Sequence, residues 1–293
     1  MLACLRYTDY APVVFHAFST GIDRSTPIAS TEYTPMSDSD INYSIEHGVA
    51  TLTFNRPQAR NALTFEMYDQ LAEISQSLID NHEHLHALVV TGAGDKAFAA
   101  GTDISRFRDF NGPEDALNYE RQMDRVLGTF ESIPIPTIAA IRGACTGGGA
   151  AIAACCDIRI ASDDLKYGFP IARTLGNCLS LSNLSRLVYL IGAARTREII
   201  FTARLILSEE ACSIGLISEI HNDPLQRAYE LAQVMKGHAP LTMAATKEGL
   251  RRLREKAAAI ENDDLIVQCY TSNDFKEGLE AFLEKRKPQW SGK

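Results

Sequence analysis

The sequence lacks the patterns that would indicate a membrane, nucleotide or nucleic-acid function. It contains no run of about 18 apolar residues, so we expect no membrane-spanning helix and no membrane partner. It has neither a Gly-x-Gly-x-x-Gly pattern nor the spacing of a phosphate-binding loop, which argues against NAD and ATP sites. Its 29 Lys and Arg residues are outnumbered by 37 Asp and Glu, giving a net charge of −8, so we also expect no nucleic-acid partner.

Cysteine is scattered and shows no pairing pattern. The seven cysteines are an odd number without a Cys-x-x-Cys spacing, which predicts reduced thiols in a cytoplasmic protein rather than a disulfide framework. We interpret the adjacent Cys155 and Cys156 as a buried apolar pair and not as a redox switch. The alternating His82, His84 and His86 fit a polar loop better than a zinc site, so no metal is expected.

The hydrophobic pattern divides the chain into three regions. Residues 1–40 show no periodicity and no secretory signal, and we expect a disordered or non-native extension with Met36 as the natural start. Residues 41–223 alternate short apolar runs typical of strands with helical patterns. Residues 224–293 contain helical patterns only. This order predicts an α/β core followed by a helical region.

Two local patterns near the start of the core are specific enough to name. Two β-rich runs flank His47 and Gly48, which predicts a hairpin over residues 41–54. A helix is expected after the break at Pro57, because apolar residues then recur at helical spacing on one face. These residues are Met67, Leu71, Ile74 and Leu78.

Two segments of small residues are the candidates for binding chemistry. Residues 97–104 follow a short apolar run, and the triplet at residues 147–149 opens a helix of small residues at 150–154. Small residues allow backbone N–H groups to approach a ligand closely, and the start of a helix adds free donors. Directed at one point, the two segments would hold a carbonyl oxygen that gains negative charge. The alternative interpretation is that both are tight turns required for packing.

Five motifs in order carry a resemblance to a known family. The motifs are RPQARNAL, VVTGAGDKAFAAGTDI, PTIAAIRGACTGGG, CDIRIAS and FKEGLEAFLEKRKP. Together they resemble the crotonase (enoyl-CoA hydratase/isomerase) superfamily over residues 41–291. The resemblance implies an α/β spiral of ββα repeats over 41–223 and a helical oligomerisation region over 224–293, in a homotrimer or a dimer of trimers. It also implies an acyl-CoA thioester substrate with no separate cofactor, because coenzyme A is part of the substrate.

The resemblance also assigns roles to individual residues. The backbone N–H groups of Thr102 and Gly148 would form the oxyanion hole for the thioester oxygen. Six positions would bind the substrate and its coenzyme A: Ala59, Arg60, Ala62, Ala100, Phe282 and Lys285.

The sequence departs from the family where its hydratases carry two catalytic glutamates. Ala151 and Ile171 occupy those positions. A shift in alignment does not restore the pair, because no Asp or Glu occurs between Gly149 and Asp157 or anywhere in residues 165–197. The usual acid–base groups of hydration are therefore missing.

Other polar residues are candidates for the missing chemistry. Residues 169–177 bring Arg173, Thr174 and Asn177 near the expected pocket, where they would bind an anion, orient water or only cap the loop. Residues 119–121 lie where this family often has a mobile lid, and Glu120 is the best candidate for a base outside the usual positions.

The sequence therefore favours a hydratase/isomerase-like lyase that stabilises a thioester enolate. Two alternatives stay open. One is an acyl-CoA decarboxylase, or another lyase or hydrolase that does not use the glutamate pair. The other is a catalytically silent subunit that binds acyl-CoA.

Overall fold

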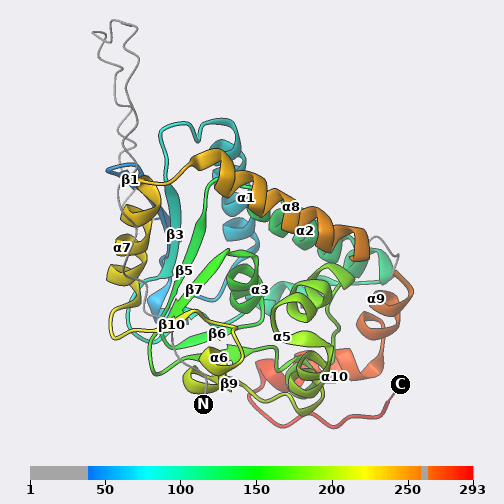
Figure 1. The fold of residues 1–293 in the computed structure, drawn as a ribbon. Helices are drawn as coiled ribbons and strands as arrows, with labels where there is room; N and C mark the ends of the chain where they lie inside the picture. Colours follow the sequence, from blue (N-terminus) through cyan, green and yellow to red (C-terminus); the bar gives the residue numbers. More distant parts are fainter. Residues whose placement is uncertain (1–38, 259–262, 293) are drawn as a thin grey trace, which may run out of the picture. The chain divides into compact units, whose positions relative to one another are not determined.

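The computed structural model describes residues 39–258 and 263–292 (Figure 1). The predicted extension over residues 1–40, with the candidate start at Met36, lies outside the described residues except for its last two positions. The helices and strands are those of residues 39–258 and 263–292.

The strands form two sheets. The larger sheet contains, in spatial order, β1 (Ile41–Glu46), β2 (Val49–Phe54), β3 (Ala87–Gly92), β5 (Thr137–Ile141), β7 (Ile158–Ala161) and β10 (Glu219–Ile220). The smaller sheet contains β4 (Ala97–Ala99), β6 (Ala144–Thr146), β8 (Lys166–Gly168) and β9 (Ile206–Leu207). The β1–β2 and β8–β9 pairs are antiparallel, and the other neighbouring strands are parallel.

Helices connect and cover these strands. The α-helices are α1 (Phe65–Asp80), α2 (Pro113–Glu131), α3 (Gly148–Cys155), α4 (Ile171–Thr174), α5 (Leu181–Thr202), α6 (Ser208–Ser213), α7 (Pro224–Lys236), α8 (Pro240–Ala258), α9 (Asp263–Tyr270) and α10 (Asn273–Leu283). Two 3₁₀ helices, η1 (Pro57–Ala59) and η2 (Ile104–Asp109), lie in the connections. None of the described helices is long and apolar enough to cross a bilayer.

The strand order shows the expected spiral of ββα units. In the units β3–β4–α2, β5–β6–α3 and β7–β8–α4, the first strand joins the larger sheet and the second joins the smaller one. Each unit therefore adds one parallel strand to each sheet before its helix returns the chain. The predicted fold class is confirmed.

The two local predictions near the start of the core are also confirmed. His47 and Gly48 have φ values of 51° and 82°, the left-handed conformation of a tight hairpin turn between β1 and β2. Helix α1 begins after Thr64, whose hydroxyl accepts a hydrogen bond from the Met67 amide at 3.2 Å. Its apolar face is buried, with Leu71 only 1% exposed.

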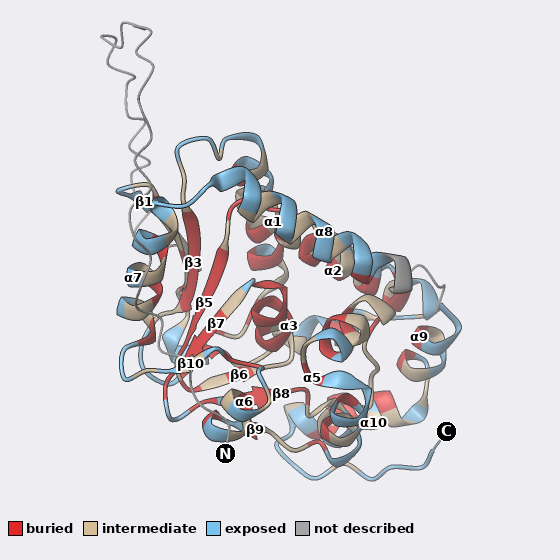
Figure 2. Cartoon of the chain, viewed as in Figure 1, coloured by how far each residue is buried: buried red, intermediate tan, exposed pale blue. Residues whose placement is uncertain are grey.

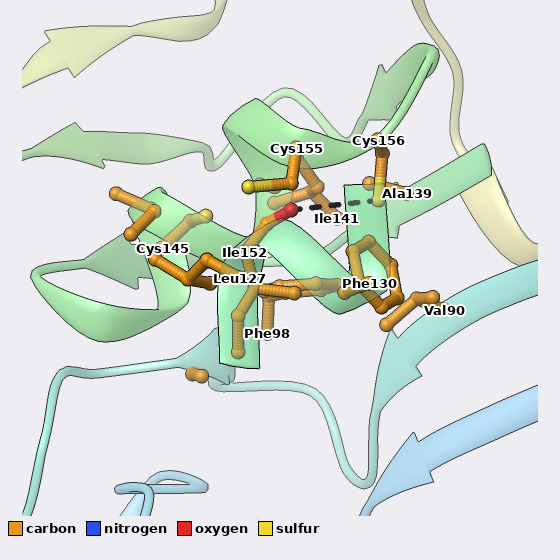
Figure 3. Close-up of a cluster of buried hydrophobic side chains, with 14 of the residues drawn as sticks. Val90, Phe98, Leu127, Phe130, Ala139, Ile141, Cys145, Ile152, Cys155 and Cys156 are labelled. Atoms are coloured by element: carbon orange, nitrogen blue, oxygen red, sulfur yellow. Dashed lines mark hydrogen bonds between the residues drawn. The ribbon is translucent and has the colours of Figure 1, made fainter. Parts of the chain in front are cut away.

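The core lies between the larger sheet and the helices α1, α2 and α3. Strands β3 and β5 and helix α3 are buried along nearly their whole length (Figure 2). Cys155 and Cys156 lie in this apolar cluster with Phe130, and Cys156 Sγ donates to the Ile152 carbonyl at 3.6 Å (Figure 3). Burial raises the pKa of the Cys155 thiol to about 12, so the thiol stays protonated and the apolar interpretation is confirmed.

Helix α7 covers the other face of the larger sheet (Figure 1). Ala228 and Ala232 are fully buried in a second cluster with Val89 and Ile138. The strands end at β10 and α7 follows directly, but α7 packs on the sheet, whereas α8 packs on α5 and α9 packs on α2. The assignment of residues 224–293 to an oligomerisation region stays a prediction.

The start of α3 packs against β4 without room for a side chain. A Cβ atom on Gly149 would lie 2.3 Å from the Ala99 carbonyl oxygen and 2.7 Å from the Ala99 Cβ. Both neighbours belong to the core, so neither can move cheaply. Glycine is therefore required here to bring the two backbones together.

We expect Gly149→Ala to lower the free energy of unfolding by about 1–3 kcal/mol, the usual cost of overpacking a core. Gly128→Ala is the matched control, because Gly128 lies within α2 and a Cβ there meets nothing within 4 Å. Alanine at Gly128 should raise stability by about 0.5–1 kcal/mol through helix propensity. Urea titrations of both variants test this, and equal stabilities would contradict the packing argument.

Candidate active site

A cavity of about 170 Å³ lies where the two small-residue segments meet. Its wall consists of the segment that follows β4, the start of α3, one face of α2 and the segment that follows β8, with Phe282 from α10. Most of the lining side chains are apolar. A concave, mostly apolar space with a few polar groups is typical of a small-molecule site.

Thr102 and Gly148 both line this cavity and both keep a free backbone donor. Leu63 pairs with the chain on either side of Thr102, donating to the Gly101 carbonyl at 2.9 Å and accepting from the Asp103 amide at 2.8 Å. The Thr102 N–H has no acceptor within the described residues. Gly148 is the first residue of α3, where helix N–H groups lack an internal partner, and it too has no acceptor there.

Tyr68, which the sequence analysis did not single out, lies between these two positions. Its Oη forms a 2.8 Å hydrogen bond with Thr102 Oγ1 and lies 2.0 Å from the place that a Cβ on Gly148 would occupy. Burial raises the pKa of Tyr68 to about 12, with a smaller contribution from the negative charge of Glu120. The hydroxyl is therefore neutral at physiological pH. The only indication of Tyr68 in the sequence was its position beside the apolar face of the helix that became α1.

The positions at which the resemblance expects two glutamates also lie on this cavity. Ala151 and Ile171 both contribute to its wall. Of the described residues, only Glu120 brings a carboxyl group to the lining. No cluster of three or more His, Cys, Asp or Glu side chains suited to a metal ion occurs in the described ranges.

Glu120 is a buried carboxyl group held by a tyrosine. It is 6% exposed, and Tyr270 Oη from α9 donates to its Oε1 at 2.5 Å. Asn177 Nδ2 in turn donates to Tyr270 Oη at 3.3 Å. Burial raises the pKa of Glu120 to about 7, the Tyr270 hydrogen bond opposes this, and the charge of Asp124 adds to it. The pKa lies in the range in which a carboxyl group can both accept and donate a proton near neutral pH.

The other polar candidates have different positions. Thr174 and Asn177 line the cavity, as expected, whereas Arg173 lies between the lining residues Ile171 and Thr174 but is exposed and does not itself contribute to the lining. It belongs to the short helix α4. Residues 119–121, expected in a lid, lie within the 19-residue helix α2. Arg121 there is exposed and pairs with Asp263 at 2.8 Å.

The predicted coenzyme-binding positions are brought together in part. Ala100 lines the cavity, and its amide donates to the Arg60 carbonyl at 3.0 Å, so the turn at residues 59–62 lies beside the cavity. Phe282 reaches the cavity and is 53% exposed. Lys285 follows α10, is exposed and does not contribute to the wall.

Asn61 fixes this turn and was also missed by the sequence analysis. Its side chain is fully buried, with Oδ1 accepting from the Arg56 amide at 2.9 Å and Nδ2 donating to the Ala97 carbonyl at 2.8 Å. Its φ of 55° is one that asparagine tolerates better than most residues. The sequence could have indicated this role, because an asparagine at the point where a strand breaks often fixes a turn.

Comparison with known proteins identifies relatives along most of the chain. Residues 44–293 match the family described as enoyl-CoA hydratase/isomerase. The short-chain-enoyl-CoA hydratase of Clostridium acetobutylicum is 34% identical over 248 residues, covering 83% of this chain and 94% of that protein. An enoyl-CoA hydratase/carnithine racemase from Magnetospirillum magneticum has a solved structure that is 32% identical with a TM-score of 0.71, covering 90% of this chain and 100% of that one. A methylmalonyl-CoA decarboxylase with 2S-carboxypropyl-CoA is 28% identical with a TM-score of 0.78, covering 88% and 100%.

The buried carboxyl group should make stability depend on pH. The folded protein holds the Glu120 proton more tightly than the unfolded chain between pH 4.5 and about 7, so the free energy of unfolding falls as pH rises through this window. Glu120→Gln should remove that fall and raise stability at pH 8 by up to about 3 kcal/mol, at about 1.4 kcal/mol for each unit of pKa. Denaturant titrations between pH 4 and 8 measure this.

Glu114→Gln is the matched control, because Glu114 is an exposed carboxyl group on the same helix. Its pH profile should follow that of the wild type. If the free energy of unfolding changed with pH in the same way in the wild type and in Glu120→Gln, burial of Glu120 would not be the cause of the pH dependence.

Proposed function

The chain belongs to the enoyl-CoA hydratase/isomerase family, and we propose that it stabilises the enolate of an acyl-CoA thioester between the backbone N–H groups of Thr102 and Gly148. As a member of this family it is an acyl-CoA-processing, enoyl-CoA hydratase/isomerase-like enzyme. The single observation that carries the proposal is the pair of free N–H groups on one cavity wall.

The chemistry of this pair suits a thioester. When a bond at the carbon next to the carbonyl breaks, its electron pair moves onto the carbonyl oxygen, which becomes negative. Two fixed N–H donors stabilise that charge without reorganising, and an apolar wall strengthens the interaction. Backbone donors do not depend on side-chain identity, so a threonine serves at position 102.

Decarboxylation is the second candidate reaction. It is favoured by Ala151 and Ile171, because loss of carbon dioxide leaves its electron pair on the thioester and requires no carboxylate base. The similarity to methylmalonyl-CoA decarboxylase structures, at 28% identity, supports the same reaction class. A syn hydration would require carboxyl groups that these two positions do not supply.

We place coenzyme A along the turn that contains Ala59, Arg60 and Ala62, beside Ala100, with Phe282 at the mouth of the cavity. We propose that Lys285 meets the coenzyme's phosphates from outside the cavity wall. Apolar side chains exposed on α5 and α8 support a homotrimer or a dimer of trimers, which we expect in the cytoplasm. They include Val188, Tyr189, Phe201, Leu241, Leu250 and Leu253.

Removal of one donor tests the oxyanion assignment. Proline is accepted at the first position of a helix, so Gly148→Pro deletes the N–H without breaking α3. Its ring would meet Tyr68 Oη, so the comparison is between Tyr68→Phe and Tyr68→Phe/Gly148→Pro. The second change should lower turnover by about 10²–10³-fold, the usual cost of one such donor.

The substrate for this assay is the acyl-CoA that the wild type converts, found by mass spectrometry across enoyl-, hydroxyacyl- and methylmalonyl-CoA. Circular dichroism confirms folding. Unchanged turnover in the folded double variant would rule out the role of Gly148. Binding of every acyl-CoA without any change of mass would instead favour a silent subunit.

Restoring the glutamates tests whether the cavity has the family's geometry. Ala151→Glu/Ile171→Glu should gain hydration of crotonyl-CoA, seen as addition of one water, since both positions line the cavity. Each single variant is the control and should remain inactive in hydration. A folded double variant that binds crotonyl-CoA without hydrating it would contradict the geometry.

A further inference from the structure

One carboxyl group in the cavity has no structural role that accounts for it. Glu120 is 6% exposed, and within the described residues no Lys or Arg pairs with it. A buried carboxyl group without a cation is costly to a fold. Its hydrogen bond goes to Oε1, and Oε2 has no partner in the described part of the chain. The second oxygen therefore remains available to a ligand in the cavity.

The partner of Glu120 is itself held in place. Tyr270 donates to Glu120 and accepts from Asn177 Nδ2, so three side chains from α2, α9 and the segment after α4 form one chain of hydrogen bonds. The Oδ1 of Asn177 is buried without a partner, although Asn177 lines the cavity. A buried acceptor left unpaired beside a cavity is where a ligand donor or a water is expected.

We propose that Glu120 is the proton-transferring residue of this site and that Tyr270 is its positioning residue. This inference rests on the proposed enolate function and assigns to it the base that the usual positions lack. It places the reaction among proton transfers on the acyl chain, with isomerisation of an unsaturated acyl-CoA as the overall class.

The step balances without a further reactant. The C–H bond next to the thioester carbonyl breaks, the proton goes to Glu120 Oε2, and the electron pair moves onto the oxygen held by Thr102 and Gly148. The protonated carboxyl group then returns the proton to the same carbon. When the acyl chain has a double bond that starts at the next carbon, the proton goes instead to the far carbon of that double bond, and the double bond moves next to the carbonyl. One carboxyl group suffices for this transfer.

The position of Glu120 on α2 fits this role. Glu120, Met123 and Leu127 recur at helical spacing and all line the cavity, so a carboxyl group and an apolar stripe share one wall. The stripe suits an acyl chain. Glu120 also lies close to the oxyanion side of the cavity. Its negative charge contributes to the raised pKa of Tyr68, and Tyr68 forms a hydrogen bond with Thr102.

The groups around Glu120 set the pKa of its carboxyl group. Burial raises its pKa to about 7, and the hydrogen bond from Tyr270 limits the rise. The ionisable groups that interact with it come from α1, α2, the segment after α4, and α9: Tyr68, Tyr119, Asp124, Cys178 and Tyr270.

Hydrogen exchange at the acyl chain tests the proposal on the full-length protein. Butyryl-CoA and octanoyl-CoA are incubated with enzyme in D₂O, and gain of deuterium is followed by mass spectrometry. We expect exchange by the wild type and by Glu114→Gln, a carboxyl control on the same helix. Glu120→Gln should lose at least about 10²-fold, the usual contribution of a general base, while still binding coenzyme A.

Two further variants keep the test decisive. Glu120→Ala should regain exchange when formate is added, which a purely structural role would not produce. Tyr270→Phe should retain exchange, but the midpoint of its rate-against-pH profile should move upward from about 7, because the carboxylate loses its donor. A midpoint that does not move would overturn the positioning role.

The outcomes separate this inference from the function on which it rests. If the wild type exchanges or decarboxylates a substrate and Glu120→Gln does so equally fast, the role of Glu120 is overturned and the enolate function stands. If the wild type binds butyryl-, octanoyl- and methylmalonyl-CoA but neither exchanges nor converts any of them, the enolate function fails and the inference fails with it.

Discussion

The candidate site depends on one close contact between backbones. Gly147 and Gly149 at the start of α3 lie directly against Gly101 and Ala99 at the end of β4, with the Tyr68 hydroxyl filling the space beside Gly148. The two sheets create this contact, because parallel pairing of β4 with β6 brings both segments to the same edge. The helix start and the strand end then leave free N–H groups beside one cavity, which packing by ordinary side chains would have filled.

The helix that carries Glu120 is held in place by buried ion pairs. Glu131, at the end of α2, accepts hydrogen bonds from Arg186 of α5 at 3.1 Å and from Arg254 of α8. Both arginines are almost fully buried, so removing the shared carboxylate would leave two unpaired charges. These ion pairs join α2, which carries Glu120, to α5 and α8. A costly buried carboxyl group at the site is tolerated because the surrounding helices hold their positions independently of it.

Much of the fold could be predicted from the sequence, because its signals are local. The hairpin at His47 and Gly48 and the apolar face of α1 follow from turn chemistry and helical period. The position of Thr102 and Gly148 on one cavity could also be predicted, since small residues and motif order mark those two segments; their role in an oxyanion hole stays a proposal. The contact that holds Glu120 was not predictable, because Tyr270 lies far along the chain from Glu120 and only the packing of α9 on α2 joins them.

The central claim is that the thioester carbonyl of a bound acyl-CoA is polarised by two backbone N–H donors. The infrared carbonyl band of an acyl-CoA labelled with ¹³C at the thioester carbon reports this directly, measured free and bound to the protein. The account predicts a bound band at lower frequency than in water, because fixed donors weaken the C=O bond more than mobile solvent does. A bound band at the solution frequency, with binding confirmed in the same sample, would contradict the account.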